Sequence, residues 1–220
     1  RWYQEDGKTQ IFRLFEGERN TRNDRAGAAR IESYSTFKWG PGAGSWNEWT
    51  GRYTIIKPHG CAIFQAKNNK NDWGIMLNLH SNGDIKLNHR RHQEDYVIAR
   101  NMTGTSFDIR VLDNGHDYMV WLNNELVGTG YYDRPEGTTN FRWGMYDGTI
   151  GHHAMILVSG ATVRADVDPD WPYIDDNEPP APPTGLSATF GSSTVSLDWD
   201  DNTEDDIAGY KVYRSDSQSN

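Results

Sequence analysis

Several features that commonly staple or anchor a protein are scarce in this sequence. It contains one cysteine, Cys61, which excludes a disulfide within the chain and gives no cysteine framework for a metal. We predict that Cys61 is a small buried side chain at the start of a strand. No apolar run approaches the roughly 20 residues that a membrane-spanning helix needs, and no signal peptide is visible. Because the chain begins with Arg1 rather than methionine, we expect that a leader was removed or the sequence trimmed.

Basic residues are scarce relative to acidic ones. The chain has 22 Lys and Arg against 31 Asp and Glu, which gives a formal net charge of -9. This balance argues against nucleic acid or an anionic membrane as a partner held by bulk charge. A site for an anionic ligand must therefore be a local group of cations.

Helical periodicity is almost absent from the sequence. Short runs with strand-like alternation are instead separated by turn-forming residues, at 57–60, 81–83, 113–116 and 123–125. Apolar residues make up only 35% of the chain, but 9 Trp, 11 Tyr and 7 Phe supply large side chains for a core. The pattern predicts an all-β fold, a β-jelly roll of the concanavalin-like sandwich type, over residues 1–165.

The composition changes after residue 165. Residues 166–183 are acidic and rich in proline, which is typical of a stiff, solvated linker, and their aspartates lack the spacing of an EF-hand. Residues 184–220 resemble the opening strands of a fibronectin type III module but cover under half of one. We therefore expect a truncated module from a longer bacterial protein that is secreted or held at the cell surface, and we expect a monomer.

The most informative stretch is 140–148, which alternates two chemistries along one predicted strand. Side chains of a strand point to opposite faces with a period of two. Phe141, Trp143 and Met145 therefore share an apolar face, whereas Arg142 and Tyr146 share a polar face with a glycine between them. A cation, a phenol and a gap beside the backbone favour a groove that binds an anion.

Two further segments offer polar faces of the same kind. Arg30, Glu32 and Tyr34 are spaced by two residues, as are Gln65 and Lys67. Each set therefore lies on one face of its strand. On the concave side of a curved sheet, the three faces converge where an extended polymer would bind.

These three segments resemble motifs of the jelly-roll polysaccharide lyases, a group that includes alginate, glucuronan and ulvan lyases. Those enzymes carry an Arg-x-Glu strand, a Gln-x-His or related strand and a late strand of the form Phe-Lys-x-Gly-x-Tyr, and this chain has 30–32, 65–67 and 141–146 in that order. Lys67 stands where alginate lyases usually have histidine, which is closer to ulvan lyases with a Lys/Tyr pair. The resemblance implies β-elimination on a uronate polymer without a cofactor, with ulvan favoured and glucuronan or alginate next.

The elimination itself dictates which groups the site needs. The proton at C5 of a uronate is weakly acidic because the adjacent carboxylate is already negative, so a cation or amide must neutralise that carboxylate. We assign this role to Arg30 and Gln65, with Arg142 as an alternative. Tyr146 is the candidate acid for the departing oxygen. Either Tyr146, made more acidic by nearby cations, or Lys67 is the base, and the residues alone leave this open.

The remaining candidates would bind the polymer. Loop tryptophans stack on sugar rings, and the arginines after the first hairpin contact carboxylate or sulfate groups. His80, or His59 in a preceding turn, is a substitute for the missing histidine. No metal site is predicted, although a structural calcium is compatible with the sequence. The predicted substrate-binding set is Arg142, His80, Asn78, Glu32, Tyr34, Arg90, Arg91, Trp46 and Trp49.

Two other functions fit the composition less well. A non-catalytic carbohydrate-binding module on the same fold uses aromatic rings and cations, but it has no need of a Lys/Tyr pair on neighbouring strands. A glycoside hydrolase needs two carboxylates facing one way at short spacing. Glu32, Glu48 and Glu94 are isolated, and Glu16 with Glu18 falls in a loop-like region, so hydrolysis is the weakest of the three hypotheses.

Overall fold

The computed structural model divides the chain into two compact units, Arg1–Pro172 and Tyr173–Asn220, which are described separately below. Within the described ranges, no helix is long and apolar enough to cross a bilayer. The structure describes residues 2–18, 29–70, 73–89, 96–132, 136–147, 151–169, 182–192, 194–200, 202, 210 and 212.

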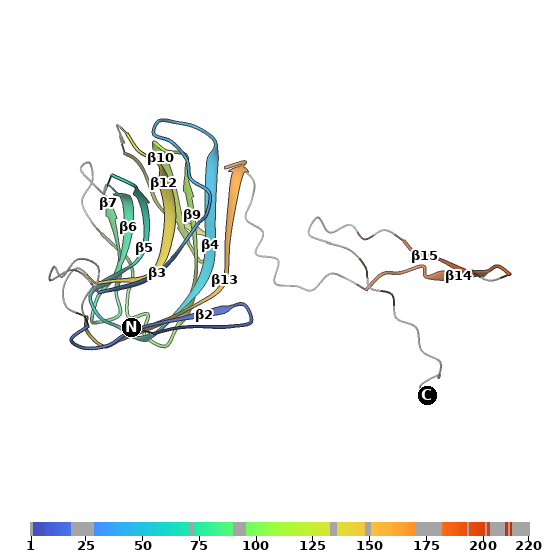
Figure 1. Ribbon diagram of the computed structural model, residues 1–220, viewed down its shortest axis with the longest axis horizontal. Coiled ribbons are helices and arrows are strands. Elements are labelled where there is room, and N and C mark those ends of the chain that lie inside the picture. Colours follow the sequence, from blue (N-terminus) through green and yellow to red (C-terminus); the bar gives the residue numbers. More distant parts are fainter. Residues whose placement is uncertain are drawn as a thin grey trace. The chain divides into compact units, whose positions relative to one another are not determined.

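Two antiparallel sheets form the larger unit and face each other across a common core (Figure 1). The seven-stranded sheet has the order β1-β2-β13-β4-β9-β10-β11. Its strands are β1 (Trp2–Asp6), β2 (Thr9–Leu14), β4 (Trp46–Lys57), β9 (Ser106–Asp113), β10 (Asp117–Leu122), β11 (Glu125–Tyr131) and β13 (Ala154–Val167).

The six-stranded sheet carries all three polar segments singled out in the sequence. Its order is β3-β12-β5-β6-β7-β8, so β12 lies between the other two segments. Its strands are β3 (Arg30–Tyr34), β5 (Cys61–Asn68), β6 (Trp73–Leu79), β7 (Ile85–His89), β8 (Tyr96–Ala99) and β12 (Thr139–Tyr146). An all-β sandwich is thereby confirmed, and non-consecutive strands are neighbours in both sheets, as a jelly roll requires.

Aromatic side chains fill the space between the sheets. Trp49 is 0% exposed, and its ring lies 5.0 Å from that of Phe64 and 6.0 Å from that of Trp143, measured between centroids. Tyr53 and Phe107 stack 5.7 Å apart in the same layer. Large rings of this kind bury much area per residue, which explains how a chain with few apolar residues builds a continuous core.

The predicted subsite role of Trp46 and Trp49 is wrong. Both residues lie in β4, which begins at Trp46, so the loop between the sheets ends earlier than the Gly, Pro and Ser content indicated. Trp49 is enclosed by the core, and Trp46 pairs with Val167 of β13 in the sheet that does not carry the polar segments. Neither tryptophan can form a sugar-stacking surface beside Arg30 or Tyr146.

Several predicted turns are confirmed by the strand pairing. β6 and β7 form a hairpin around residues 81–83, and β9 and β10 form another around 114–116. Asn123 and Asn124 join β10 to β11 with φ angles of 47° and 66°, a left-handed conformation that asparagine tolerates better than most residues.

The smaller unit contains a two-stranded hairpin of β14 (Ser187–Phe190) and β15 (Val195–Asp198). Its apolar side chains are largely exposed, with Phe190 at 80% and Leu186 at 68%. The hairpin agrees with the strands expected there, and its assignment to a fibronectin type III module stays a prediction.

We expect Trp49→Ala to destabilise the larger unit by about 3–5 kcal/mol, because it removes a fully buried indole and leaves a cavity. Urea denaturation followed by tryptophan fluorescence and circular dichroism measures the change. Trp46→Ala is the matched control and should cost much less, since Trp46 is only half-buried. A Trp49→Ala protein of normal stability but weaker polysaccharide binding would contradict the structural assignment.

Candidate active site

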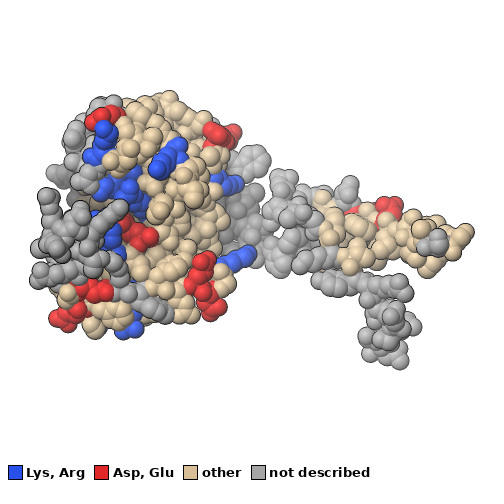
Figure 2. All heavy atoms as spheres, viewed as in Figure 1, with Lys and Arg blue, Asp and Glu red and all other residues tan. Residues whose placement is uncertain are grey.

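The candidate site is the outer face of the six-stranded sheet around β12. Phe141 and Met145 are 0% exposed and point into the core, which turns Arg142 and Tyr146 outward, as the alternation predicted. Tyr146 lies directly opposite Arg30 of β3, and Arg142 lies opposite Gln65 of β5. Figure 2 shows Lys and Arg side chains gathered on one face of this unit with an acidic group among them.

Gly144 leaves room for a side chain of β3 to meet a side chain of β5 above β12. Its φ is 128°, and a side chain there would collide with the carbonyl oxygen of Ile31, so only glycine fits. Gly144 lies opposite Glu32 in the β3–β12 register. Above this gap, Gln65 Nε2 donates a hydrogen bond of 2.5 Å to Glu32 Oε1. The space predicted beside the Gly144 backbone is therefore occupied by the backbone of β3 and by the hydrogen-bonded side chains of Glu32 and Gln65.

The bridge places a carboxylate beneath a group of cations. Burial raises the pKa of Glu32, while the hydrogen bond from Gln65 and the charges of Arg30, Arg142 and Lys67 oppose that rise. Burial is also the main cause that lowers the pKa of Arg142, against the attraction of Glu32. In both residues burial makes the charged form less favourable, so the charges on this face are incompletely solvated.

Arg30 and Tyr146 bring a cation and a phenol into contact on this face of the sheet. The guanidinium carbon of Arg30 lies 4.9 Å from the centroid of the Tyr146 ring, within the range of a cation–π interaction. Arg30 Nε is buried and has no hydrogen-bond partner among the residues that the structure describes. A buried donor without a partner is unfavourable and suits a site that receives an acceptor from a ligand.

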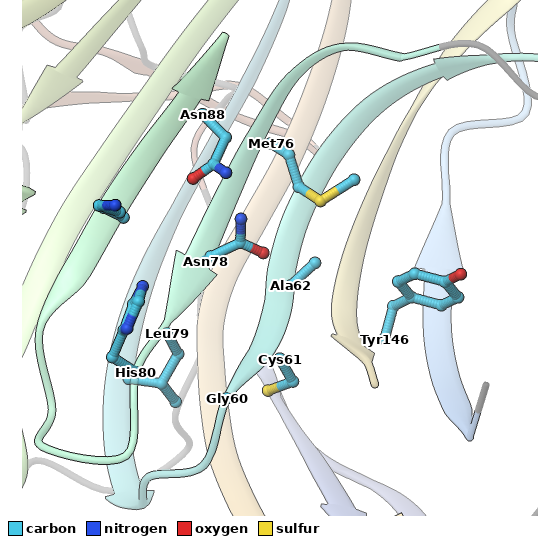
Figure 3. A pocket seen from close by; sticks show the side chains of 10 residues that line it. Gly60, Cys61, Ala62, Met76, Asn78, Leu79, His80, Asn88 and Tyr146 are labelled. Atoms are coloured by element: carbon cyan, nitrogen blue, oxygen red, sulfur yellow. The ribbon is translucent and has the colours of Figure 1, made fainter. Parts of the chain in front are cut away.

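A pocket of about 420 Å³ opens beside Tyr146. Ala62 of β5 forms its floor, because it lies opposite Tyr146 on one side and Asn78 of β6 on the other (Figure 3). Lys86 and Asn88 of β7 continue the same face toward the far wall. Neither residue was predicted from the sequence, although their spacing by two after the 81–83 turn was a usable signal.

Lys67 occupies a different part of the groove from Tyr146. Lys67 lies opposite Asn140, whereas Tyr146 lies opposite Ala62. Ala62 and Lys67 are five positions apart on β5, which corresponds to about 16 Å of backbone. Lys67 and Tyr146 therefore lie on the same face of the sheet, but near opposite ends of β5 and β12.

The other predicted residues fall into four groups. Asn78 and the exposed His80 line the pocket, and Tyr34 is 64% exposed at the outer edge of β3. His59 lies in the turn after β4 and approaches Asp147 rather than the polar row. Burial and the charge of His152 lower its pKa, against the effect of Asp147. Arg90 and Arg91 lie outside the described residues.

Cys61 is buried at the first position of β5, as predicted. Burial, followed by the nearby charge of Asp147, raises the pKa of its thiol to about 12. The thiolate is therefore negligible at neutral pH, and Cys61 acts as a small apolar residue at the edge of the pocket.

No protein-family profile matches this sequence, and no curated protein matches it significantly. Solved structures do match the fold. An alginate lyase of polysaccharide lyase family 7, AlgAT5, aligns with a TM-score of 0.58 at 16% identity over 76% of this chain and 83% of its own. The alginate lyase from Corynebacterium sp. aligns with a TM-score of 0.61 at 14% identity over 74% and 81%. The family 7 alginate lyase AlyA1 from Zobellia galactanivorans gives 0.55 at 12% identity over 74% and 80%. The likeness shows that the larger unit shares the jelly-roll fold of these proteins.

We expect Glu32→Gln to stabilise the protein at neutral pH. Because the folded-state pKa of Glu32 is raised, the folded protein holds the proton more tightly than the unfolded chain does, and stability falls as pH rises through the interval between the two pKa values. A glutamine has no charge to desolvate, so the advantage of the variant should grow with pH and vanish in acid.

Urea midpoints measured from about pH 4 to about pH 8 test this expectation. Glu136→Gln is the control, since the Glu136 side chain is 64% exposed. A Glu32→Gln variant that is less stable than the native protein at neutral pH would show that the carboxylate stabilises the fold through its cations.

Proposed function

We propose that the larger unit is a polysaccharide lyase that cleaves a uronate-containing anionic polysaccharide by β-elimination. The observation that carries the proposal is the Arg30 guanidinium against the ring of Tyr146, which itself lines a pocket whose polar residues include Asn78, Asn88 and Lys86. The shared fold with alginate lyases supports it, as does a local group of cations in a chain of net charge -9.

The cations would act on the carboxylate of the sugar whose C5 proton is removed. Charge that develops on this carboxylate in the transition state is stabilised by donors already in position. Arg30 offers a guanidinium whose Nε has no hydrogen-bond partner in the described part of the chain, and Arg142 lies two strand positions from Gly144 on the same face. Gln65 donates to Glu32, so in this proposal it mainly holds that carboxylate in place and leaves the substrate to the two arginines.

Tyr146 would act as both base and acid. Its phenolate oxygen takes the C5 proton, the electrons of the C5–H bond form the C4=C5 double bond, and the C4–O4 bond breaks. The same phenol then protonates the departing O4, so no water is consumed and the tyrosine returns to its starting state.

Lys67 would bind the polymer instead of taking the proton. The C5 hydrogen and O4 belong to one sugar ring, whereas Lys67 and Tyr146 begin about 16 Å apart along β5. A lysine at that distance fits the carboxylate of a neighbouring sugar, where a cation contributes to binding in the ground state and the transition state alike.

Alginate takes first place among the substrates in this proposal. Several of the similar solved structures are alginate lyases, and one of them is a complex of an alginate lyase with the product GGG. Ulvan and glucuronan remain alternatives, because Lys67 stands where the alginate lyases usually have histidine. The predicted non-catalytic binding module is the remaining alternative, since it would use the same amides and cations without turnover.

Purified protein incubated with alginate, ulvan, glucuronan and pectate tests the reaction class. We expect ultraviolet absorbance from a new C4=C5 double bond on at least one uronate polymer. Tyr146→Phe should lower kcat by about 10²-fold or more, because it removes the proton-transfer group, while polymer affinity changes little.

Tyr131→Phe is the matched control on the other sheet and should keep native turnover. Retention of polymer without absorbance would indicate a binding module, and new reducing ends without absorbance would indicate hydrolysis. Native turnover by Tyr146→Phe would remove Tyr146 from the mechanism.

Substitutions of Lys67 separate its two candidate roles. If Lys67 binds a carboxylate, Lys67→Arg keeps the charge and should retain most of kcat, while Lys67→Met should raise KM. Initial rates over a range of polymer concentrations measure both parameters. A Lys67→Arg variant as inactive as Tyr146→Phe would instead identify Lys67 as the base, because an arginine cannot lose its proton near neutral pH.

A further inference from the structure

A second group of reactive side chains lies at the end of the candidate groove, outside its polar row. His59 is in the turn between β4 and β5, Asp147 directly follows β12, and His152 precedes β13. One nitrogen of each imidazole and one carboxylate oxygen all lie within 4.8 Å of one another. Segments far apart in the sequence therefore bring three metal-ligating groups to one point.

Both imidazoles approach the same carboxylate oxygen. His152 Nδ1 lies 3.2 Å from Asp147 Oδ2, and His59 Nε2 lies 3.9 Å from it. Ligand atoms around a tetrahedral zinc ion, with bonds of about 2.0–2.2 Å, are about 3.4 Å apart. The two observed separations bracket that value, and the two imidazole nitrogens lie within 4.8 Å of each other, so side-chain rotations that bring these nitrogens together would complete the geometry.

The two imidazole rings are stacked, with centroids 3.9 Å apart and planes 26° from parallel. Two rings in face contact present their edges to one side, and here that side holds the Asp147 carboxylate. Nitrogen lone pairs lie in the ring planes, so one of the two rings must turn out of the stack before both nitrogens can bind one ion.

The surroundings of Asp147 favour a bound cation. Its side chain is only 4% exposed, and its backbone N–H donates to the carbonyl oxygen of Ala29 at 2.8 Å, which fixes its position. A buried carboxylate needs compensation by positive charge. His152 is 47% exposed, so the cluster is open to solvent on one side for entry of an ion and for a water as fourth ligand.

We propose that His59, Asp147 and His152 bind one divalent transition-metal ion, with zinc as the best fit. Two imidazole nitrogens and one carboxylate oxygen match the ligand preference of zinc and its neighbours, whereas calcium and magnesium prefer oxygen ligands alone. The ion ties the β4–β5 turn and the segment before β13 to the end of β12. The calcium considered from the sequence remains a separate prediction.

The ion has a structural role in this proposal: it holds in place the segment next to Tyr146, which directly precedes Asp147 in the chain. Its ligands are not the residues assigned to the polysaccharide. The inference therefore does not depend on the proposed lyase activity, and metal binding is measured in the absence of any polymer.

The test uses the full chain, freed of metal with EDTA and then dialysed against buffer without chelator. Isothermal titration with ZnCl₂ should give one ion per chain. At a free zinc concentration about 100-fold above Kd, the Tm should rise by about 5 °C or more. Addition of CoCl₂ should produce visible absorption bands of a low-symmetry N/O site, which are far stronger than those of the hydrated ion.

Variants assign the ligands. His152→Gln changes a partly exposed side chain and should fold normally, yet it should weaken zinc binding by at least about tenfold, as should Asp147→Asn. His116→Gln is the matched control, because His116 Nδ1 also lies 2.9 Å from a carboxylate, that of Asp117, but belongs to no such cluster among the described residues. It should bind zinc as tightly as the native chain.

Three results would overturn the proposal. The first is a native chain that shows neither one-to-one zinc binding nor a rise in Tm. The second is a His152→Gln variant with native affinity, or a loss of binding equally caused by His116→Gln. The third is saturation by CaCl₂ or MgCl₂ at concentrations where ZnCl₂ has no effect, which would identify a site for hard cations.

Discussion

The burial of one face of β12 is the constraint on which the candidate site depends. Phe141 and Met145 are fully enclosed by the core, and Trp143 is 8% exposed. A slip of one residue in the register would exchange these side chains with Arg142 and Tyr146, placing a guanidinium in an aromatic core. The packing between the sheets thus keeps Arg142 and Tyr146 on the outer face. Because β3 and β5 both pair with β12, the position of β12 also fixes which of their residues lie beside these two side chains.

A cost in stability accompanies this arrangement. Arg30, Arg142 and Lys67 lie around the partly buried Glu32, and Gln65 donates its hydrogen bond to that carboxylate. Raised and lowered pKa values on neighbouring groups indicate that the face is poorly solvated in its resting state. Such a face is prearranged for an anionic ligand, because the ligand supplies the charge that the fold leaves unbalanced.

The sequence was most informative where a period of two decides which face a side chain takes. The polar faces at 30–34, 65–67 and 141–146 do adjoin on one sheet, because strand alternation needs only local sequence. It was misleading at Trp46 and Trp49, since the Gly- and Pro-rich segment before them resembled a loop that continued to residue 49. β4 starts at Trp46, earlier than that composition indicated. The composition of the preceding segment does not predict where a 12-residue, largely buried strand begins.

Long-range register is the information that sequence patterns lack. Lys86 and Asn88 enter the pocket only because β7 pairs with β6 in one particular alignment, and the offset of Lys67 from Tyr146 follows from the β5–β12 register. The meeting of His59, Asp147 and His152 depends on where a turn, a strand end and a further segment lie in space. Tyr146 and Asp147 are consecutive, so a restraint on the carboxylate also restrains the backbone from which the phenol projects. The groove and the histidine cluster are thus coupled through one peptide bond, although they share no side chain.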